Sequence, residues 1–476
     1  MKPRKNQHVL IVISSFVLAA GFVVAIGGSE WEPVHSIFHK NSSSVVTAPE
    51  ASIPSPPPRE ALEFRMVDFN QGWLKYTDGM MRTTDGGASW QEAEGSPAGE
   101  QPISSMATDG TISELIGLES GSMIPEIDTN MNSLTRNGVT YPLKQSQFLT
   151  PRIGWGLLAN AKDAKAAGFQ QPLLVTVDGG QTWMDGVTPE VAAAIMQEKN
   201  HLEQVKKEAA LYASRDTAKA AISAKWKLIP EHAAPGDVVL VRHDEPGSVT
   251  WLGKTYKLQP YGAGYFTYLP ITMQAKAGKY PIGDQTLTID AKKFETQYLQ
   301  VTAQMESMKQ DTNRIAADQK KIDLARSESQ PEFLYTGPFV QPIEGILTTP
   351  YGYTRYVNGK LDSSHMAIDL AAKEGTPIKA TNDGVVALAE PLYLTGNSIY
   401  IDHGMGLFSQ YAHLSELRVK TGDRVKQGDI IGLVGTTGFS TGPHLHFTFW
   451  AHNVQVNPNL FFNTTPFQWV KPSGGN

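Results

Sequence analysis

Frequent glycine turns separate short, alternating apolar runs over residues 335–466, and Ile399–Ile401 is one such run. Successive side chains of a strand point to opposite faces of a sheet, so this alternation predicts half-buried β-strands. Tight glycine turns join such strands as antiparallel neighbours. This part of the chain is therefore expected to form an antiparallel β domain.

The whole chain is too long for that domain alone. It has 476 residues, and a single hydrophobic core stops growing near about 250–300 residues. The predicted fold class is multidomain and mainly β. A long helical hairpin and a single N-terminal transmembrane helix, described below, complete that prediction.

The C-terminal domain also contains candidate metal ligands. His365 and Asp369 form a His-x-x-x-Asp pair, and His444 and His446 form a His-x-His pair further along the chain. Imidazole nitrogens and a carboxylate oxygen suit zinc, and a catalytic zinc keeps three protein ligands with its fourth place open to water. The chain has no cysteine, so nitrogen and oxygen have to hold the ion. The sequence thus offers four candidates for three ligand places.

Strand geometry indicates how the surplus candidate is used. His444 and His446 begin an apolar run that is typical of a β-strand, so their side chains emerge on the same face. One can bind the metal while the other faces the same pocket as an acid or base. His413, at the end of another alternating segment, supplies a second group that can accept or donate a proton.

These residues resemble the lysostaphin and LytM type of zinc metallopeptidase, a family of peptidoglycan endopeptidases, over residues 335–460. The resemblance is carried by the blocks His365–Asp369, Gly375–Ala380, Asp383–Val386, Gly396–Gly404, Tyr411–Leu414, Gly428–Gly432 and Gly438–His446. It implies that His365, Asp369 and His446 bind zinc, while His413 and His444 flank the metal-bound water. It also implies a β domain with an open groove.

The resemblance implies a reaction as well. Zinc lowers the pKa of its bound water towards about 7 and polarises the scissile carbonyl. His413 and His444 are then expected to take the proton of the water, to stabilise the oxyanion and to protonate the leaving amine. The sequence leaves open which histidine has which role.

Two positions near the first ligand need comment. The family carries a tyrosine before this histidine, for which Tyr356 is nearest by spacing and Tyr351 and Tyr353 are alternatives. The family commonly has glycine two residues after the histidine, where this chain has Ala367. A methyl group there would crowd the backbone if φ were positive, although alanine is the mildest replacement.

The N-terminus predicts a membrane anchor. Basic residues within 1–8 precede an uncharged run over 9–28, which is long enough for a hydrocarbon core of about 30 Å. Flanking positive charges place residues 1–8 in the cytoplasm, so the chain is expected to be a single-pass protein of the cell membrane with its bulk outside the cytoplasm. A cleaved signal peptide is the alternative. Residues 29–60 are rich in proline and serine, which predicts an extended linker.

Residues 61–187 contain an internal repeat. Thr83–Trp90 and Thr176–Trp183 each include Asp-Gly-Gly followed by a tryptophan. They resemble Asp-box repeats, in which Asp-Gly-Gly forms a tight hairpin turn above the tryptophan. Two copies are too few for a closed propeller, so a small or irregular propeller-like β domain is expected.

Two segments have a helical pattern. Alanine and charged or amide residues dominate 188–229, and apolar residues keep heptad spacing there and over 291–330. Two long helices are predicted to pair as an antiparallel hairpin, with the alternative that each apolar stripe packs on a neighbouring domain. Between them, short β-like runs with glycine turns over 230–290 predict a small antiparallel sandwich.

The predicted function is that of a membrane-anchored zinc endopeptidase, which hydrolyses peptide bonds of peptidoglycan. Zn²⁺ is the expected cofactor, and peptidoglycan, the membrane and a regulatory protein are the expected partners. A net charge of −6 argues against nucleic acid as a partner. The alternatives are a non-catalytic regulator or activator of another cell-wall hydrolase and a glycan-cleaving Asp-box enzyme. Residues 467–476 are predicted to be a disordered tail.

Overall fold

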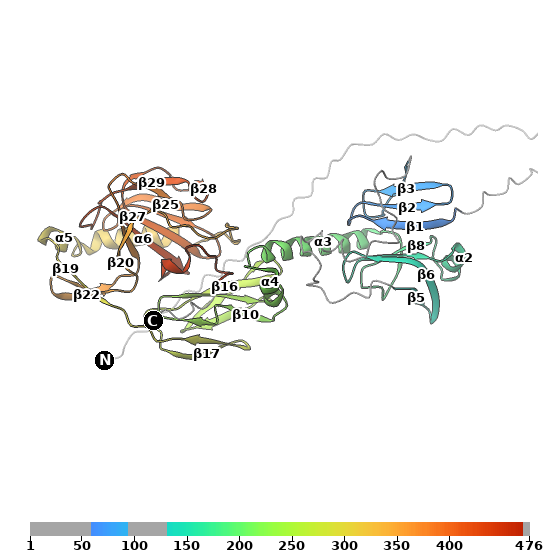
Figure 1. Cartoon of the computed structure of the whole chain (residues 1–476), viewed down its shortest axis with the longest axis horizontal. Helices are drawn as coiled ribbons and strands as arrows, with labels where there is room; N and C mark the ends of the chain where they lie inside the picture. The colour runs from blue at the N-terminus through green and yellow to red at the C-terminus, as the bar shows by residue number, and fades with distance from the viewer. Residues whose placement is uncertain (1–58, 94–130, 470–476) are drawn as a thin grey trace, which may run out of the picture. The chain divides into compact units, whose positions relative to one another are not determined.

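The computed structural model describes residues 59–93 and 131–469 (Figure 1). Within them the chain is mainly β, as predicted. The predicted tail 1–8, the anchor 9–28, nearly all of the linker 29–60 and residues 470–476 lie outside them. None of the helices in the described ranges is both long and apolar enough to cross a membrane. The prediction of a single-pass protein at the cell membrane is therefore corrected, because no described helix supports it.

Residues 61–93 and 131–185 form two antiparallel sheets whose strands follow chain order. The first sheet contains β1 (Ala61–Met66), β2 (Gly72–Tyr76), β3 (Gly79–Thr83) and β4 (Gln91–Ala93). The second contains β5 (Ser133–Arg136), β6 (Val139–Phe148), β7 (Gly154–Leu158), β8 (Leu173–Thr176) and β9 (Met184–Asp185), with α2 (Ala161–Ala166) between β7 and β8. Alternate apolar side chains such as Phe64, Trp155 and Leu157 are buried between them.

The two repeated motifs form turns with equivalent hydrogen bonds. The Oγ1 of Thr83 donates to Asp85 Oδ1 at 2.8 Å, and the Oγ of Ser89 donates to Asp85 Oδ2 at 2.6 Å. At the second turn Thr176 and Thr182 bond the two oxygens of Asp178 at the same distances. The glycines after each aspartate have positive φ, which the turn requires. The resemblance to Asp-box repeats itself stays a prediction.

The predicted long helical hairpin is wrong, because both segments break. Helix α3 (Pro189–Ala209) ends before Ser214, whose capping box with Thr217 starts a new helix, α4 (Arg215–Ile222). The second segment begins with a strand, β19 (Thr296–Leu299), and continues only as α5 (Ala303–Met308) and α6 (Thr312–Ala325).

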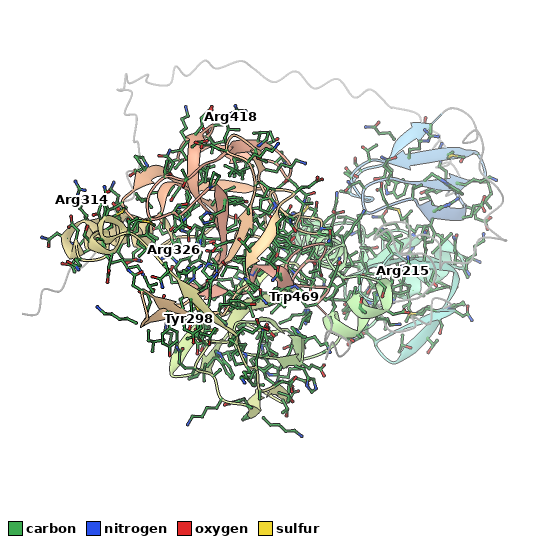
Figure 2. The ribbon with its side chains drawn as sticks, turned by 60° about the vertical axis from the view of Figure 1, so that its left-hand side comes forward. Arg215, Tyr298, Arg314, Arg326, Arg418 and Trp469 are labelled. Atoms are coloured by element: carbon green, nitrogen blue, oxygen red, sulfur yellow. The ribbon has the colours of Figure 1, made fainter. Side chains whose placement is uncertain are left out.

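Each apolar stripe instead packs on a neighbouring part of the chain, as the alternative interpretation had it. Val191 and Ile195 of α3 join the core of the first β region. Ile322 of α6 packs against Leu388 and Tyr400 of the C-terminal domain. Next to this contact the guanidinium of Arg326, labelled in Figure 2, lies 3.6 Å from the centre of the Trp450 ring.

Residues 226–289 form a small β unit with three sheets. The strands are β10 (Trp226–Ile229), β12 (Val238–His243), β16 (Gly264–Pro270) and β15 (Gln259–Tyr261) in the first, β11 (His232–Ala233), β18 (Gln285–Ile289) and β17 (Gly278–Ile282) in the second, and β13 (Ser248–Trp251) with β14 (Lys254–Lys257) in the third. The pairing is antiparallel except between β11 and β18. A buried ion pair joins α3 to this unit: Arg242 Nε donates to Glu208 Oε1 at 2.6 Å. Removing one partner of such a pair typically costs about 3–5 kcal/mol.

The C-terminal domain is built on a ten-stranded sheet. Its strands are β20 (Ile346–Thr349), β23 (Ile368–Ala371), β24 (Pro377–Lys379), β25 (Gly384–Leu392), β26 (Gly396–Asp402), β27 (Leu407–Leu417), β28 (Arg424–Val425), β29 (Ile430–Val434), β30 (His444–Ala451) and β31 (Val454–Val456). The short helix η2 (Pro458–Leu460) follows. A separate three-stranded sheet contains β19, β21 (Thr354–Val357) and β22 (Lys360–Ser364), with β21 in the middle.

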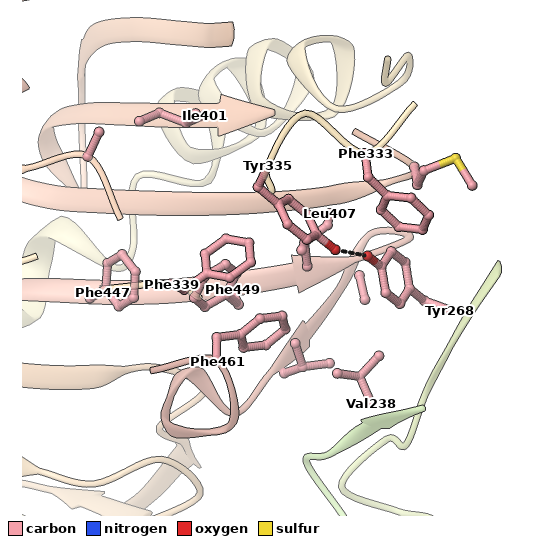
Figure 3. Packing of buried hydrophobic residues seen from close by; sticks show 14 of the residues in the cluster. Val238, Tyr268, Phe333, Tyr335, Phe339, Ile401, Leu407, Phe447, Phe449 and Phe461 are labelled. Atoms are coloured by element: carbon pink, nitrogen blue, oxygen red, sulfur yellow. Dashed lines mark hydrogen bonds between the residues drawn. The ribbon is translucent and has the colours of Figure 1, made fainter. Parts of the chain in front are cut away.

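Aromatic side chains fill the core of this domain (Figure 3). The rings of Phe449 and Phe461 stack at 3.9 Å, and the hydroxyl of Tyr335 lies 3.1 Å from that of Tyr268 on β16 of the small β unit. Trp469 is also buried, so the packed chain continues past the predicted boundary at residue 466. Strands β23, β27 and β30 of the same sheet carry residues of the polar site described next.

Candidate metal centre

The register of two neighbouring strands brings the predicted residues together. Strands β23 and β30 pair antiparallel, with Asp369 opposite His446 and Ala371 opposite His444. His444 and His446 are two residues apart on β30, so both side chains emerge on the same face. His365 precedes β23 and is almost fully buried, with 2% of its side chain exposed.

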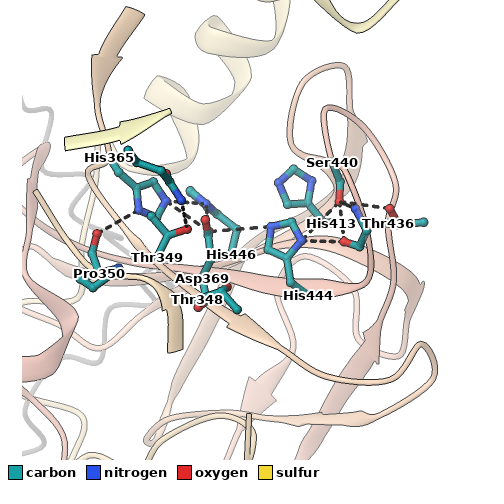
Figure 4. A network of polar contacts seen from close by, with 12 residues as sticks. Thr348, Thr349, Pro350, His365, Asp369, His413, Thr436, Ser440, His444 and His446 are labelled. Atoms are coloured by element: carbon teal, nitrogen blue, oxygen red, sulfur yellow. Dashed lines mark hydrogen bonds and ion pairs between the residues drawn. The ribbon is translucent and has the colours of Figure 1, made fainter. Parts of the chain in front are cut away.

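Three ligand atoms converge at this face (Figure 4). Asp369 Oδ1 lies 3.2 Å from His365 Nε2 and 2.9 Å from His446 Nδ1. The two imidazole nitrogens are 3.4 Å apart. All three atoms are close enough together to hold one metal ion.

Backbone carbonyls fix which ring nitrogen faces the site. The Nδ1 atoms of His365, His413 and His444 lie 3.2, 2.8 and 2.7 Å from the carbonyl oxygens of Pro350, Thr437 and Gly442. A carbonyl only accepts a hydrogen bond, so each Nδ1 carries the proton and donates it. The Nε2 atom of each ring therefore keeps a lone pair. For His365 that lone pair faces the other two candidate ligand atoms, and the carbonyl bond orients the ring.

His413 lies on β27 beside the other histidines. Its ring centre is 4.9 Å from that of His444 and 5.7 Å from that of His446. Its φ of +65° is unusual for a residue other than glycine, and such strain is concentrated at functional sites. Burial, followed by the charges of His446 and His444, lowers the pKa of His413 to about 3. The ring is therefore neutral at pH 7, with a lone pair on Nε2.

The carboxylate of Asp369 is ionised in this setting. Burial alone would raise its pKa, but the neighbouring imidazoles of His365 and His446 lower the pKa of Asp369 overall. Its second oxygen, Oδ2, accepts a hydrogen bond from Arg355 Nη2 at 2.8 Å. Two imidazole nitrogens and one carboxylate oxygen, in a chain without cysteine, form a donor set that fits zinc.

Sequence reasoning missed Arg355 and its partner Gln297, whose Oε1 accepts from Arg355 Nε at 3.0 Å. In the sequence, Arg355 stands out only as an arginine in the strand-like run before His365. Nothing in the sequence points to Gln297 as part of the site. Because β19 and β21 are separated by more than fifty residues, only their pairing shows that the two side chains are neighbours.

The three tyrosines that could correspond to the family's tyrosine each have a defined contact in the structure. Tyr351 is buried and donates to the carbonyl of Gln455, while Tyr353 donates to Glu295. The ring of Tyr356 packs on that of Tyr298, 5.2 Å away. Ala367 is fully buried, and it is not among the described residues with positive φ. Its methyl group therefore causes no backbone strain of the kind considered above.

Comparison with known proteins agrees with this geometry. Residues 363–458 match peptidase family M23. The chain is 44% identical over 102 residues to the peptidoglycan DD-endopeptidase ShyC of Vibrio cholerae, covering 21% of this chain and 23% of that protein. It is 41% identical over 129 residues to the glycyl-glycine endopeptidase ALE-1 of Staphylococcus capitis, covering 26% of this chain and 34% of that protein.

Among solved structures, the chain is similar to the catalytic domain of lysostaphin from Staphylococcus simulans. The identity is 35%, the TM-score is 0.22, and the match covers 24% of this chain and 90% of that one. The chain thus spans only about a quarter to a third of the length of the two curated relatives. Within that span, residues 363–458 form a peptidase family M23 domain of the LytM type.

Proposed function

We propose that this chain is a zinc-dependent endopeptidase that hydrolyses peptide bonds in the cross-links or stem peptides of peptidoglycan. The observation that carries the proposal is the convergence of His365 Nε2, Asp369 Oδ1 and His446 Nδ1 on one point. The relatives support the substrate class, because ShyC is named a peptidoglycan DD-endopeptidase and ALE-1 a glycyl-glycine endopeptidase. We assign residues 335–466 to the peptidase domain.

Zinc, when bound, supplies Lewis acidity at the scissile carbonyl and lowers the pKa of water towards about 7. The protein's own contribution is proton transfer and orientation. His444 Nε2 lies 3.8 Å from Asp369 Oδ1 and so faces the ligands. His413, neutral at pH 7, presents its Nε2 lone pair from the neighbouring strand.

The two histidines suit complementary tasks. His413 is deeply buried, and its carbonyl bond to Thr437 holds the ring still, which suits removal of a proton from the attacking water. His444 is 17% exposed and also lies 3.3 Å from the hydroxyl of Ser440. When its Nε2 carries a proton taken up from solvent, it is placed to donate a hydrogen bond to the developing oxyanion. The proton that His413 took from the water then passes to the leaving amine.

Residues 61–187 are proposed to be an Asp-box β domain. The support is the equivalence of the two turns, whose aspartates make the same side-chain bonds. Those bonds use both carboxylate oxygens, so Asp85 and Asp178 serve the turns and any glycan or protein binding falls to the rest of the domain.

The test is mass analysis of fragments released from peptidoglycan of defined structure. We expect the zinc-loaded full chain to convert cross-linked muropeptides to smaller peptides with the gain of one water per bond. A chelator should abolish the release and zinc should restore it. The variant His444→Ala should be strongly impaired, and His201→Ala, at an exposed position of α3, should behave as the wild type. Glycan fragments with intact peptides would instead indicate a glycosidase, and no release at all would favour the regulator of another hydrolase.

A further inference from the structure

Strand β19 lies outside the matched residues 363–458, yet it adds directly to the hairpin that precedes the first ligand. It pairs parallel with β21 in unbroken register, with Gln297 opposite Arg355 and Tyr298 opposite Tyr356. Side chains alternate along a strand, so Gln297 and Arg355 share one face of the sheet. Tyr298 and Tyr356 share the other face, where Tyr298 is 72% exposed (Figure 2).

A chain of hydrogen bonds runs from β19 to the metal ligand. The amide of Gln297 uses both its ends: Nε2 donates to Thr349 Oγ1 at 3.0 Å, and Oε1 accepts from Arg355 Nε at 3.0 Å. Arg355 Nη2 then donates to Asp369 Oδ2 at 2.8 Å. The amide orientation is unambiguous, because a guanidinium has only donors.

The contact of Arg355 sets the direction of the Asp369 carboxylate. Next to Arg355 the register between β21 and β22 shifts, and the extra residue of this β-bulge is Asp362 on β22. Because Oδ2 of Asp369 is tied to the guanidinium, the carboxylate is fixed with Oδ1 towards His365 and His446.

We infer that Gln297 is a positioning residue of the metal centre and that β19 therefore belongs to the functional site. This inference rests on the proposed function. Gln297 holds the guanidinium of Arg355, and the guanidinium sets the direction of the Asp369 carboxylate. Partners of this kind, one bond beyond the ligands, typically change metal affinity or activity by about 10- to 100-fold.

Gln297 gives a cleaner test than Arg355. Removing Arg355 would change the position of the carboxylate and also delete a positive charge beside the metal, and the two changes act on metal affinity in opposite directions. Gln297 is neutral, so its replacement by leucine leaves the charge beside the metal unchanged. Tyr298 is a matched control, because it is the next residue of the same strand and faces away from the ligands.

The experiment compares the full chain with Gln297→Leu, Gln297→Glu and Tyr298→Ala. Zinc dissociation constants are measured by competition with a chromophoric chelator, and the visible spectrum of the Co²⁺-loaded protein reports ligand geometry. We expect Gln297→Leu to weaken zinc binding by about 10-fold or more and to alter the Co²⁺ spectrum. Gln297→Glu keeps an acceptor for Arg355 and should restore most of the affinity. Tyr298→Ala should leave both readouts unchanged.

The outcomes separate the two proposals. If the wild type binds zinc and Gln297→Leu binds it equally, with the same Co²⁺ spectrum, the role of Gln297 is disproved and the proposed function stands. The same conclusion follows if Tyr298→Ala weakens zinc as much as Gln297→Leu does, because strand integrity then explains the effect. If the wild type binds no zinc, the proposed function fails and this inference fails with it.

Discussion

The aspartates of the two N-terminal turns and the aspartate of the metal centre use the same carboxylate group in opposite ways. Asp85 and Asp178 bond groups two and four residues away in the chain, and these bonds use both oxygens of each carboxylate. Asp369 contacts His365, four residues away, but it also contacts Arg355 and His446, which are 14 and 77 residues away. Among the described residues, the side-chain partners of its Oδ1 are imidazole nitrogens, which a metal ion can bridge. A local carboxylate stabilises a turn, whereas a carboxylate with distant partners can form a site.

The largest expected effect lies at the metal centre. Asp369→Ala should lose stoichiometric zinc and lower kcat/KM by roughly 10³-fold or more, because a ligand and its charge are removed. Asp178→Ala should keep both zinc and activity. Zinc content by elemental analysis and hydrolysis of a cross-linked muropeptide give the comparison. Equal zinc in the two variants would show that Asp369 is no more a ligand than the turn aspartates are.

The histidines of the metal centre can likewise be compared with His403, a buried histidine outside it. His403 is fully buried, with Nδ1 bonded to the carbonyl of Asp383 and Nε2 to Ser409. Burial lowers the pKa of His403 to about 4, although the bond to Asp383 opposes this. The unfolded chain, with an ordinary histidine pKa near 6.5, binds the proton first as the pH falls. The free energy of unfolding should therefore be highest above pH 6.5 and fall by about 3 kcal/mol down to pH 4.

Urea denaturation of the wild type and His403→Asn at pH 7 and pH 4.5 measures this contribution. The variant should be less stable at pH 7 but should lose less stability on acidification. His201→Asn, at an exposed position of α3, should lose as much stability between pH 7 and pH 4.5 as the wild type does. Parallel pH profiles for all three proteins would mean that His403 does not titrate as described.

A third substitution separates proton transfer from metal binding. His413→Ala should retain zinc and lower kcat by about 10²-fold or more, the usual size for a general acid or base. The same variant should keep its zinc dissociation constant, because His413 is not among the three converging ligands. An unchanged kcat would remove His413 from the mechanism, and loss of zinc would make it a ligand.

The smallest expected effect tests whether the two turns are equivalent. Ser89→Ala and Thr182→Val each remove one side-chain bond to the turn aspartate. Each should lower stability by about 1 kcal/mol, the net value of an ordinary hydrogen bond, and leave zinc affinity unchanged. Urea midpoints of the two variants provide the measurement. Strongly unequal losses would show that the repeat is a likeness of sequence only.

Turns and site residues could be predicted from the sequence where the interacting residues are close together in the chain or match the spacing of a known family. The Asp-Gly-Gly turns and the five side chains of the site were predicted, and the structure brings His365, Asp369, His413, His444 and His446 together. Their roles stay predictions. The prediction of two long helices was wrong because Ser214, Thr302 and Asp311 each cap the N-terminus of a new, shorter helix. Gln297 lay in an apparent heptad, but pairing with β21 made it part of a strand, and such distant pairing leaves no local signal.

The most direct test of the metal centre is anomalous diffraction at the zinc edge from crystals of the zinc-loaded full chain. We expect one peak bonded to His365 Nε2, Asp369 Oδ1 and His446 Nδ1 at about 2.0–2.2 Å, with Arg355 still bonded to Asp369 Oδ2. A peak held by other side chains, or none at these three, would contradict it.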